Sequence, residues 1–358
     1  MNIIELHEES WLQLDARRSS LPSALLLAGQ RGNGKFELAQ HFVASLLCEN
    51  LSATHQACTR CLACGWFAQG NHPDFRLLQA ENTAAESPLK TSESPSQPAP
   101  EETPASEGGA SKKLSRQITI EQIRALDEFL HIGTHREGAR IVLIHGAEAM
   151  NRATANALLK SLEEPLPGTL FLLVSDEADR LLPTVRSRCQ LMTIPPVNVS
   201  RALRYLQDEQ VEDAARYLAL AGGAPLLAAQ LSRQGARQLL DALLVEMSRG
   251  RQLVPVQSAA ALERILKADK NSAALKRLIE WAQKWLFDLA LTCLARPPRY
   301  FLAETASLKS LAALTNTLKI MAFNRKAIQY KADCEQTLNT RLFLENFFIH
   351  YAALFQKR

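Results

Sequence analysis

Hydrophobic and polar positions along the first half of the chain predict buried strands that alternate with amphipathic helices. Three short apolar runs, at residues 23–29 (SALLLAG), 140–145 (RIVLIH) and 169–175 (TLFLLVS), are typical of strands buried on both faces of a parallel sheet. The helix predicted after the first run has apolar residues three or four positions apart, at Leu38, Ala39, Phe42, Val43, Leu46 and Leu47. This alternation predicts an α/β domain with a parallel sheet.

Two further helices complete this predicted domain. One begins with the capping-box spacing of Thr119 and Gln122 and has an apolar stripe at Ile120, Ile123, Leu126 and Leu130. The other covers residues 150–164 and ends before Pro165, since proline cannot continue a helix. We place the end of the domain at the proline pair of residues 195–196, so that it covers residues 1–196.

The rest of the chain has helical periodicity only. A Gly222–Gly223 break interrupts this periodicity, and we divide the segment into a small helical domain at residues 197–241 and a larger all-α domain at residues 242–358. Residues 81–116 differ from both, because Pro, Ser, Glu, Thr and Ala dominate there and large apolar side chains are almost absent. Such a segment cannot bury enough surface to offset its ordering entropy, so we expect a disordered insertion.

Composition is ordinary for a soluble globular protein. Of the 358 residues, 47% are hydrophobic and 22% are charged, and the net charge of +4 is too small to identify a nucleic-acid-binding protein by itself. No apolar run approaches the ~20 residues of a membrane span, and no secretory signal is visible. We therefore expect a cytoplasmic protein without membrane association, whose seven cysteines stay reduced.

A P-loop motif follows the first predicted strand. The segment Gly29–Phe36 (GQRGNGKF) matches G-x-x-x-x-G-K-[S/T] at Gly29, Gly34 and Lys35, and it lies between a strand and a helix, where backbone N–H groups can surround phosphates. The last position is Phe36, which has no hydroxyl with which to bind Mg²⁺. The alternatives are a glycine-rich turn in an unrelated fold and a working ATPase with unusual metal ligands.

A second defect concerns the same metal. The apolar run at residues 140–145 should end in an acidic pair, but His145 and Gly146 stand there, and Glu148 is expected in the following turn. Imidazole is a poor ligand for Mg²⁺, and glycine offers no side chain. We therefore predict a vestigial P-loop that does not hydrolyse ATP, and we do not expect ATP binding.

Four cysteines have metal-ligand spacing. Cys48, Cys58, Cys61 and Cys64 form C-x9-C-x2-C-x2-C, which suits a tetrahedral Zn²⁺ site in a module of residues 48–75 that has few apolar residues to bury. An iron–sulfur cluster is the alternative, although the bacterial pattern would continue with a further C-x3-C-P. His55 or His72 could replace Cys48 as the fourth ligand.

Two arginines follow the third predicted strand, in LLPTVRSRC at residues 181–189. An arginine at the edge of a nucleotide-binding domain can act in trans on the nucleotide of an adjacent subunit. From the chemistry alone Arg186 and Arg188 are equal candidates, and an ordinary solvated arginine is the simpler interpretation.

The order of these motifs resembles that of bacterial clamp-loader subunits, in particular the delta-prime family of DNA polymerase III. The P-loop with its nearby cysteines, ANALLKSLEEP at residues 155–165 and LLPTVRSRC carry the resemblance. It is strongest over residues 20–78 and 118–195 and weak in the helical C-terminal third.

The resemblance implies an AAA+ module, a small helical lid and a helical collar, in a non-hydrolysing subunit. Its partners would be delta and the gamma/tau ATPases, in a five-subunit ring that opens the beta sliding clamp and places it on primer-template DNA. DNA contacts would be independent of base sequence. The Ser-Arg-Cys motif of the family carries the trans-acting arginine, which corresponds to Arg188.

Two rival functions remain to be weighed. An active gamma/tau-like ATPase would need Ser or Thr at position 36, Asp-Glu at positions 145–146 and a sensor arginine near Pro225. These three departures favour delta-prime. A stand-alone zinc-dependent nucleic-acid-binding module is disfavoured because a complete α/β domain surrounds the cysteines.

Overall fold

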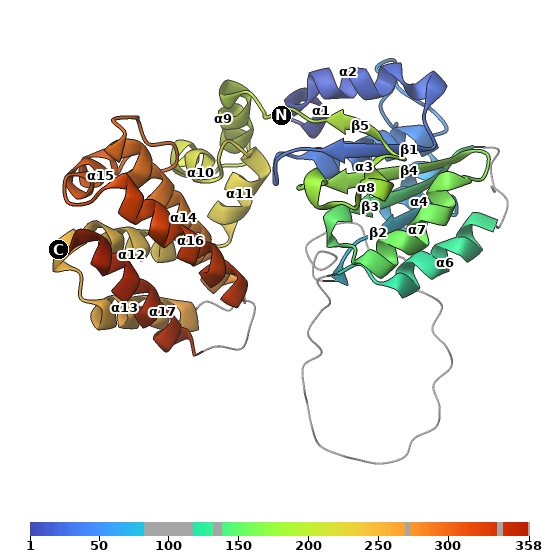
Figure 1. Ribbon diagram of the computed structural model, residues 1–358. Coiled ribbons are helices and arrows are strands. Elements are labelled where there is room, and N and C mark those ends of the chain that lie inside the picture. The colour runs from blue at the N-terminus through green and yellow to red at the C-terminus, as the bar shows by residue number, and fades with distance from the viewer. Residues whose placement is uncertain (82–116, 132–137, 269–272, 335–338, 357–358) are drawn as a thin grey trace, which may run out of the picture. The chain divides into compact units, whose positions relative to one another are not determined.

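The computed structural model describes residues 1–81, 117–131, 138–268, 273–334 and 339–356 (Figure 1). The chain divides into two compact units, Met1–Val197 and Asn198–Arg358. The insertion that we predict to be disordered lies, apart from Glu81, outside the described residues.

The first unit is built on a five-stranded parallel sheet. Its strands are β1 (Ala24–Ala28), β2 (Phe75–Leu78), β3 (Arg140–His145), β4 (Thr169–Ser175) and β5 (Gln190–Thr193). They are arranged in the order β2-β3-β4-β1-β5, and every neighbouring pair is parallel. This confirms the α/β fold predicted from the alternating pattern.

The sheet centre consists of the three apolar runs recognised in the sequence. Every residue of β1 and β4 is buried, as is all of β3 except the half-buried His145. Such strands have helices on both faces, which explains why they read as continuous apolar runs. The edge strands β2 and β5 have only four residues each, and the sequence pattern does not predict them. β5 buries only Met192 and so has no apolar run, and in β2 the half-buried Arg76 interrupts the apolar residues.

Helices cover both faces of the sheet. On one face, α6 (Ile120–His131), α7 (Arg152–Glu163) and α8 (Pro183–Arg186) share a core with alternate side chains of β1, β3 and β4. On the other face lies α3 (Lys35–Leu47), which contacts β1, β3 and β4 and is itself contacted by α1 (Ile3–Leu6), α2 (Glu8–Ala16) and α4 (Leu62–Ala68). Short 3-10 turns are formed by residues Arg18–Ser20, Ala147–Ala149 and Ala178–Arg180.

Local capping determines where two of these helices begin. The Thr119 N–H donates to Gln122 Oε1 at 2.9 Å, and the Gln122 N–H donates to Thr119 Oγ1 at 3.4 Å, which confirms the predicted capping box. Helix α7 starts two residues later than predicted, because the Asn151 side chain accepts the Thr154 N–H and caps it.

The second unit contains helices and no strand among its described residues. They are α9 (Val199–Asp208), α10 (Ala214–Leu220), α11 (Pro225–Arg233), α12 (Arg237–Ser248), α13 (Pro255–Ala268), α14 (Ala274–Cys293), α15 (Thr305–Ala312), α16 (Thr317–Asp333) and α17 (Thr340–Ala352), with 3-10 turns at Gly250–Gln252 and Ala353–Phe355. Helices α9, α10 and α11 pack on one another, as do α12 to α17. The boundary drawn after residue 241 falls inside α12.

Aromatic side chains fill the core of this helical unit. Trp281 and Trp285 of α14 are fully buried, and the Trp285 Nε1–H donates to the Tyr351 hydroxyl at 3.0 Å. That hydroxyl donates in turn to the Met247 carbonyl at 2.7 Å, so the polar atoms of Trp285 and Tyr351 are satisfied. None of the helices in the described part of the chain has the length and apolarity required to cross a bilayer.

Candidate functional site

The P-loop connects the carboxyl end of β1 to the first turn of α3. Gly34 is the N-cap residue of α3 and has a φ of 100°, a conformation that favours glycine. Gly29 lies so close to β5 that a Cβ atom there would be 2.8 Å from the Ile194 carbonyl oxygen. Two of the motif's glycines are therefore required by the loop geometry itself.

Lys35 is held by groups of the protein. Its side chain is 4% exposed, and its Nζ forms an ion pair with the Asp176 carboxylate and donates to the Gln30 carbonyl at 3.2 Å. Asp176 comes directly after β4, whose carboxyl end lies at the same edge of the sheet as that of β1. The lysine of the motif thus has an internal anionic partner.

The two residues that depart from the metal-binding pattern contact one another. The ring of Phe36 stacks on the imidazole of His145, with ring centroids 3.7 Å apart and an interplanar angle of 7°. Phe36 is buried, and burial lowers the pKa of His145 to about 4, so that its imidazole is neutral at pH 7. The His145 ring also lies 3.4 Å, by its Nδ1, from Gln79 Oε1.

The acidic residue expected in the turn after β3 has a structural task. Glu148 lies in the 3-10 turn after β3, as predicted, and its carboxylate accepts the Ser175 hydroxyl at 2.7 Å and the Asp176 N–H at 3.2 Å. It therefore fixes the end of β4 and holds Asp176 in position beside Lys35.

The N-terminal helices add a further contact to the loop. The ring of His7, which is buried at the start of α2, lies 2.5 Å by its Nε2 from the Asn33 carbonyl. Burial lowers the pKa of His7, so the neutral tautomer with a proton on Nε2 donates this hydrogen bond. The P-loop is thus fixed by contacts from α2 and from the residue that follows β4.

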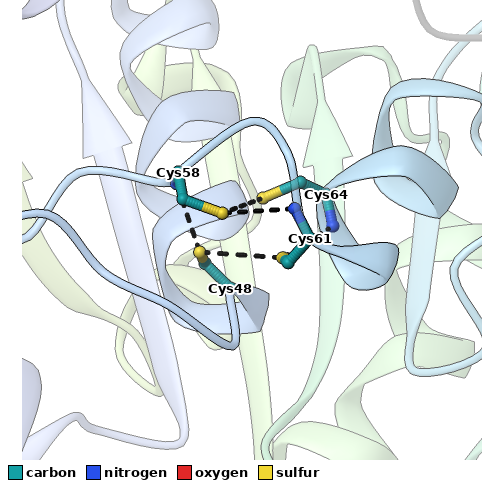
Figure 2. A group of neighbouring side chains, drawn as sticks. All are labelled: Cys48, Cys58, Cys61 and Cys64. Carbon is teal, nitrogen blue, oxygen red and sulfur yellow. Dashed lines mark hydrogen bonds between the residues drawn. The ribbon is translucent and has the colours of Figure 1, made fainter.

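Four cysteines come together between α3 and α4. Cys48 is the C-cap residue of α3, Cys61 is the N-cap residue of α4, Cys64 lies in the first turn of α4, and Cys58 lies in the loop between the two helices. Their side chains point toward one another (Figure 2), and all four Sγ atoms lie within 4.8 Å of each other. The cluster is therefore assembled across 17 residues, Cys48 to Cys64, by the two helix ends.

The sulfur geometry fits a single tetrahedral metal ion. Sγ–Sγ distances are 3.9 Å for Cys48 and Cys61 and 4.0 Å for Cys58 and Cys64. Four sulfurs around zinc, with Zn–S bonds of ~2.3 Å, would be about 3.8 Å apart. The four-cysteine cluster is able to bind a metal such as zinc.

Backbone N–H groups surround the sulfurs in a way that favours thiolates. The N–H groups of Cys58, Cys61 and Cys64 donate to the Sγ atoms of Cys48, Cys58 and Cys61, at 3.2, 3.3 and 3.4 Å. Such donors, from Arg60 and Cys61, lower the pKa of Cys58 to about 6. Burial and the neighbouring sulfurs raise the pKa of Cys64. A bound cation would lower this pKa, because it stabilises the thiolate that ligates it.

Neither histidine considered as a fourth ligand belongs to this cluster. His55 Nδ1 lies 2.8 Å from Asp15 Oδ2, and His72 Nδ1 accepts the Asp74 N–H at 3.1 Å. Cys48, which the histidines would have replaced, is a member of the sulfur cluster.

Arg188 lies between α8 and β5 on the surface of the first unit. Its guanidinium donates to the Thr184 carbonyl at 2.8 Å and forms an ion pair with Glu163 Oε1 at 2.5 Å. Arg186 is also exposed and forms an ion pair with Asp179 at 2.7 Å. Both guanidinium groups can reach solvent, so the geometry alone does not separate the two candidates.

Several residues that define these sites had not been recognised in the sequence. Asp176 is the partner of Lys35, His7 contacts the loop from the N-terminal helices, and Glu163 is the partner of Arg188. A signal existed for Asp176, because it is an acidic residue directly after a predicted buried strand. His7 and Glu163 carried no such signal.

The sheet order, the P-loop after β1 and the helical second unit define an AAA+ fold of the clamp-loader type. A model of the family described as "DNA polymerase III, delta subunit" matches residues 7–198. A DNA polymerase III subunit delta' from Pseudomonas aeruginosa is 33% identical over 352 residues, which cover 96% of this chain and 95% of the relative. The corresponding Escherichia coli subunit is 30% identical over 186 residues, or 52% of this chain and 46% of the relative.

A solved structure of a DNA polymerase III gamma subunit-related protein from Thermotoga maritima is 15% identical, covers 98% of this chain and 100% of its own, and has a TM-score of 0.43. The full-length match to the Pseudomonas protein and the family match establish the relationship. The chain belongs to the delta-prime family of clamp-loader subunits of DNA polymerase III.

Proposed function

We propose that this chain is the non-hydrolysing member of its clamp loader and that it supplies Arg188 in trans to the ATP site of a neighbouring subunit. The observation that carries the first part is the stack of Phe36 on His145. An active site of this type needs oxygen ligands for Mg²⁺ at these two positions. The buried Phe36 ring and the half-buried His145 ring in van der Waals contact offer none, which argues against an active gamma/tau-like ATPase.

The surroundings of Arg188 support its role as a trans-acting arginine. Its partner Glu163 belongs to the LEEP segment, and the two side chains are 35% and 47% exposed. An ion pair so exposed contributes only ~0.2–1 kcal/mol, so a neighbour's phosphate groups can compete for the guanidinium. The choice of Arg188 over Arg186 rests on the Ser-Arg-Cys motif.

The second unit has a surface that suits ring assembly. On α16, Leu318, Met321 and Ile328 are 82%, 53% and 63% exposed, and their spacing places them on one face of the helix. The exposed Arg325 lies within this stripe, four residues after Met321, and the exposed Lys326 lies beside it. We propose that it packs on a helix of the neighbouring subunit that is apolar with an acidic edge. Full assembly of a Leu318→Ser, Met321→Ser chain would contradict this.

The remaining parts of the proposal follow the family. In this proposal the partners of the chain are the gamma/tau and delta subunits in the cytoplasm, and together they load the beta clamp onto primer-template DNA. We propose that zinc is the metal of the four-cysteine cluster, which sulfur spacing near that of a ZnS₄ tetrahedron supports. We also propose that α9 to α11 form the lid and α12 to α17 the collar, with the boundary before α12.

ATP turnover by the purified chain tests the non-hydrolysing role. We expect no turnover above that of a Lys35→Ala chain, and we expect clamp loading when the chain is combined with gamma/tau and delta. Hydrolysis by the isolated chain that the Lys35→Ala substitution abolishes would contradict the proposal. A Cys293→Ser chain, purified in the same way, is the control for the effect of a substitution as such, because Cys293 lies in the second unit and the P-loop lies in the first.

A further inference from the structure

The P-loop retains the backbone shape of a phosphate cradle although its metal position is lost. Gly32 and Gly34 have φ angles of 71° and 100°, and the loop enters the 13-residue helix α3, whose N-terminus favours anions. What has changed is the identity of the groups that the cradle holds, and these come from the protein.

Asn33 places a side chain inside this cradle. Its Oδ1 accepts the Lys35 N–H at 3.1 Å, one of the helix N-terminal donors. Its Nδ2 is buried and has no hydrogen-bond partner among the described residues. An ideal Cβ on Gly29 would lie 3.2 Å from this Nδ2, so the orphaned donor is directed across the loop toward its first glycine. A buried donor without an acceptor in a P-loop is available to hydrogen-bond an anion that enters the loop.

Asp176 occupies the charged end of the cradle. A buried ammonium group requires a counter-ion, and Lys35 finds it in the Asp176 carboxylate. Glu148 accepts the Asp176 N–H and thereby places a second carboxylate close by. An entering phosphate would meet a lysine whose charge is already compensated and two carboxylates that repel it.

We propose that the P-loop is a latent site for a metal-free polyphosphate, such as tripolyphosphate or the diphosphate of ADP, and that Asp176 keeps it closed as an internal substitute for the phosphate. The inference rests on the proposed function in one respect: because Phe36 and His145 replace the metal ligands, it concerns binding and not hydrolysis. Removing the charge of Asp176 should therefore create an anion site without creating an ATPase.

Isothermal titration calorimetry in magnesium-free buffer tests this inference, with tripolyphosphate and ADP as probes and no chelator, so that the cysteine cluster is undisturbed. We expect no binding by the wild-type chain. Asp176→Asn, which keeps the side-chain shape, should bind at least ~10-fold more tightly than the weakest affinity that the titration can detect, ~10-fold being the factor for one charge-assisted hydrogen bond from Lys35. Adding Lys35→Met should abolish the gain. Asp179→Asn makes the same charge change at a side chain that is 98% exposed and should match the wild type.

Two results would overturn the inference: wild-type affinity in a folded Asp176→Asn chain, or a gain that survives Lys35→Met. If Asp176→Asn does not fold, Asp176→Ser provides the same test with a smaller uncharged side chain. The proposed function fails separately, since it is contradicted by ATP turnover in the wild-type chain, whatever Asp176→Asn binds.

Discussion

Phe36→Thr would return a hydroxyl to the P-loop, and we expect it to destabilise the protein without restoring hydrolysis. Phe36 is 6% exposed and stacks on His145. Replacing a buried phenylalanine with alanine costs ~3–5 kcal/mol, and an aromatic pair contributes ~0.5–1.5 kcal/mol beyond its buried area. Threonine keeps one methyl group but adds a hydroxyl that needs a partner, so we expect a loss of about 3 kcal/mol in the free energy of unfolding.

Urea unfolding of the full chain, with ATPase assays on the same samples, measures both consequences. Phe36→Leu is the matched control, because it keeps an apolar side chain and loses only the aromatic contact, at a cost of about 1 kcal/mol. ATP turnover should stay at the wild-type background in both variants, since His145 and Gly146 still provide no carboxylate. Unchanged stability of Phe36→Thr, or ATP turnover by it, would refute the reasoning.

Two further predictions concern the metal cluster and the half-buried imidazole of His145. Cys61→Ser should remove bound zinc, measured by elemental analysis, and lower the melting temperature, whereas Cys293→Ser should retain one zinc per chain. Burial lowers the folded-state pKa of His145 from its ordinary value of 6.5 to about 4. The neutral ring therefore contributes stability above pH 6.5 that is lost as the pH falls toward 4, by about 3 kcal/mol in total. His145→Phe preserves a ring against Phe36 and should flatten this pH dependence.

The controls for these two predictions lie within the same chain. Burial also lowers the pKa values of His7, His41 and His72, so wild type and His145→Phe share that part of the acid sensitivity, and only the difference between them reports on His145. An equal change in the free energy of unfolding between pH 7 and pH 5 in the two chains would contradict the assignment of this pH dependence to His145. Full zinc content in Cys61→Ser would contradict a site made of all four cysteines.

The sequence predicts the central strands well, because burial on both faces leaves a continuous apolar signal. The bounds of β3 and β4 coincide with the apolar runs at residues 140–145 and 169–175. The edge strands β2 and β5 lack this signal: β5 has three exposed positions, and the half-buried Arg76 interrupts the apolar residues of the four-residue β2. Edge strands are recognised only once their neighbours in the sheet are known.

The candidate sites also differ in how far the sequence predicts them, since only ligands close together along the chain leave a local pattern. The cysteine cluster could be predicted from spacing, because its ligands lie within 17 residues of one another. The defects at Phe36 and His145 could also be named, but their stacking requires the carboxyl ends of β1 and β3 to meet at one edge of the sheet. The pairing of Lys35 with Asp176 joins residues 141 positions apart, and no local pattern records it.

Hydrolysis by a neighbouring subunit tests the central claim most directly. Clamp loaders would be assembled from gamma/tau, delta and this chain as wild type, Arg188→Ala or Arg186→Ala, and single-turnover ATP hydrolysis would be measured at the site next to this chain. The account predicts a fall of roughly 10³-fold or more for Arg188→Ala. For Arg186→Ala it predicts a change within about twofold, the effect of losing one exposed ion pair. An unchanged rate with Arg188→Ala in a fully assembled complex would contradict the account.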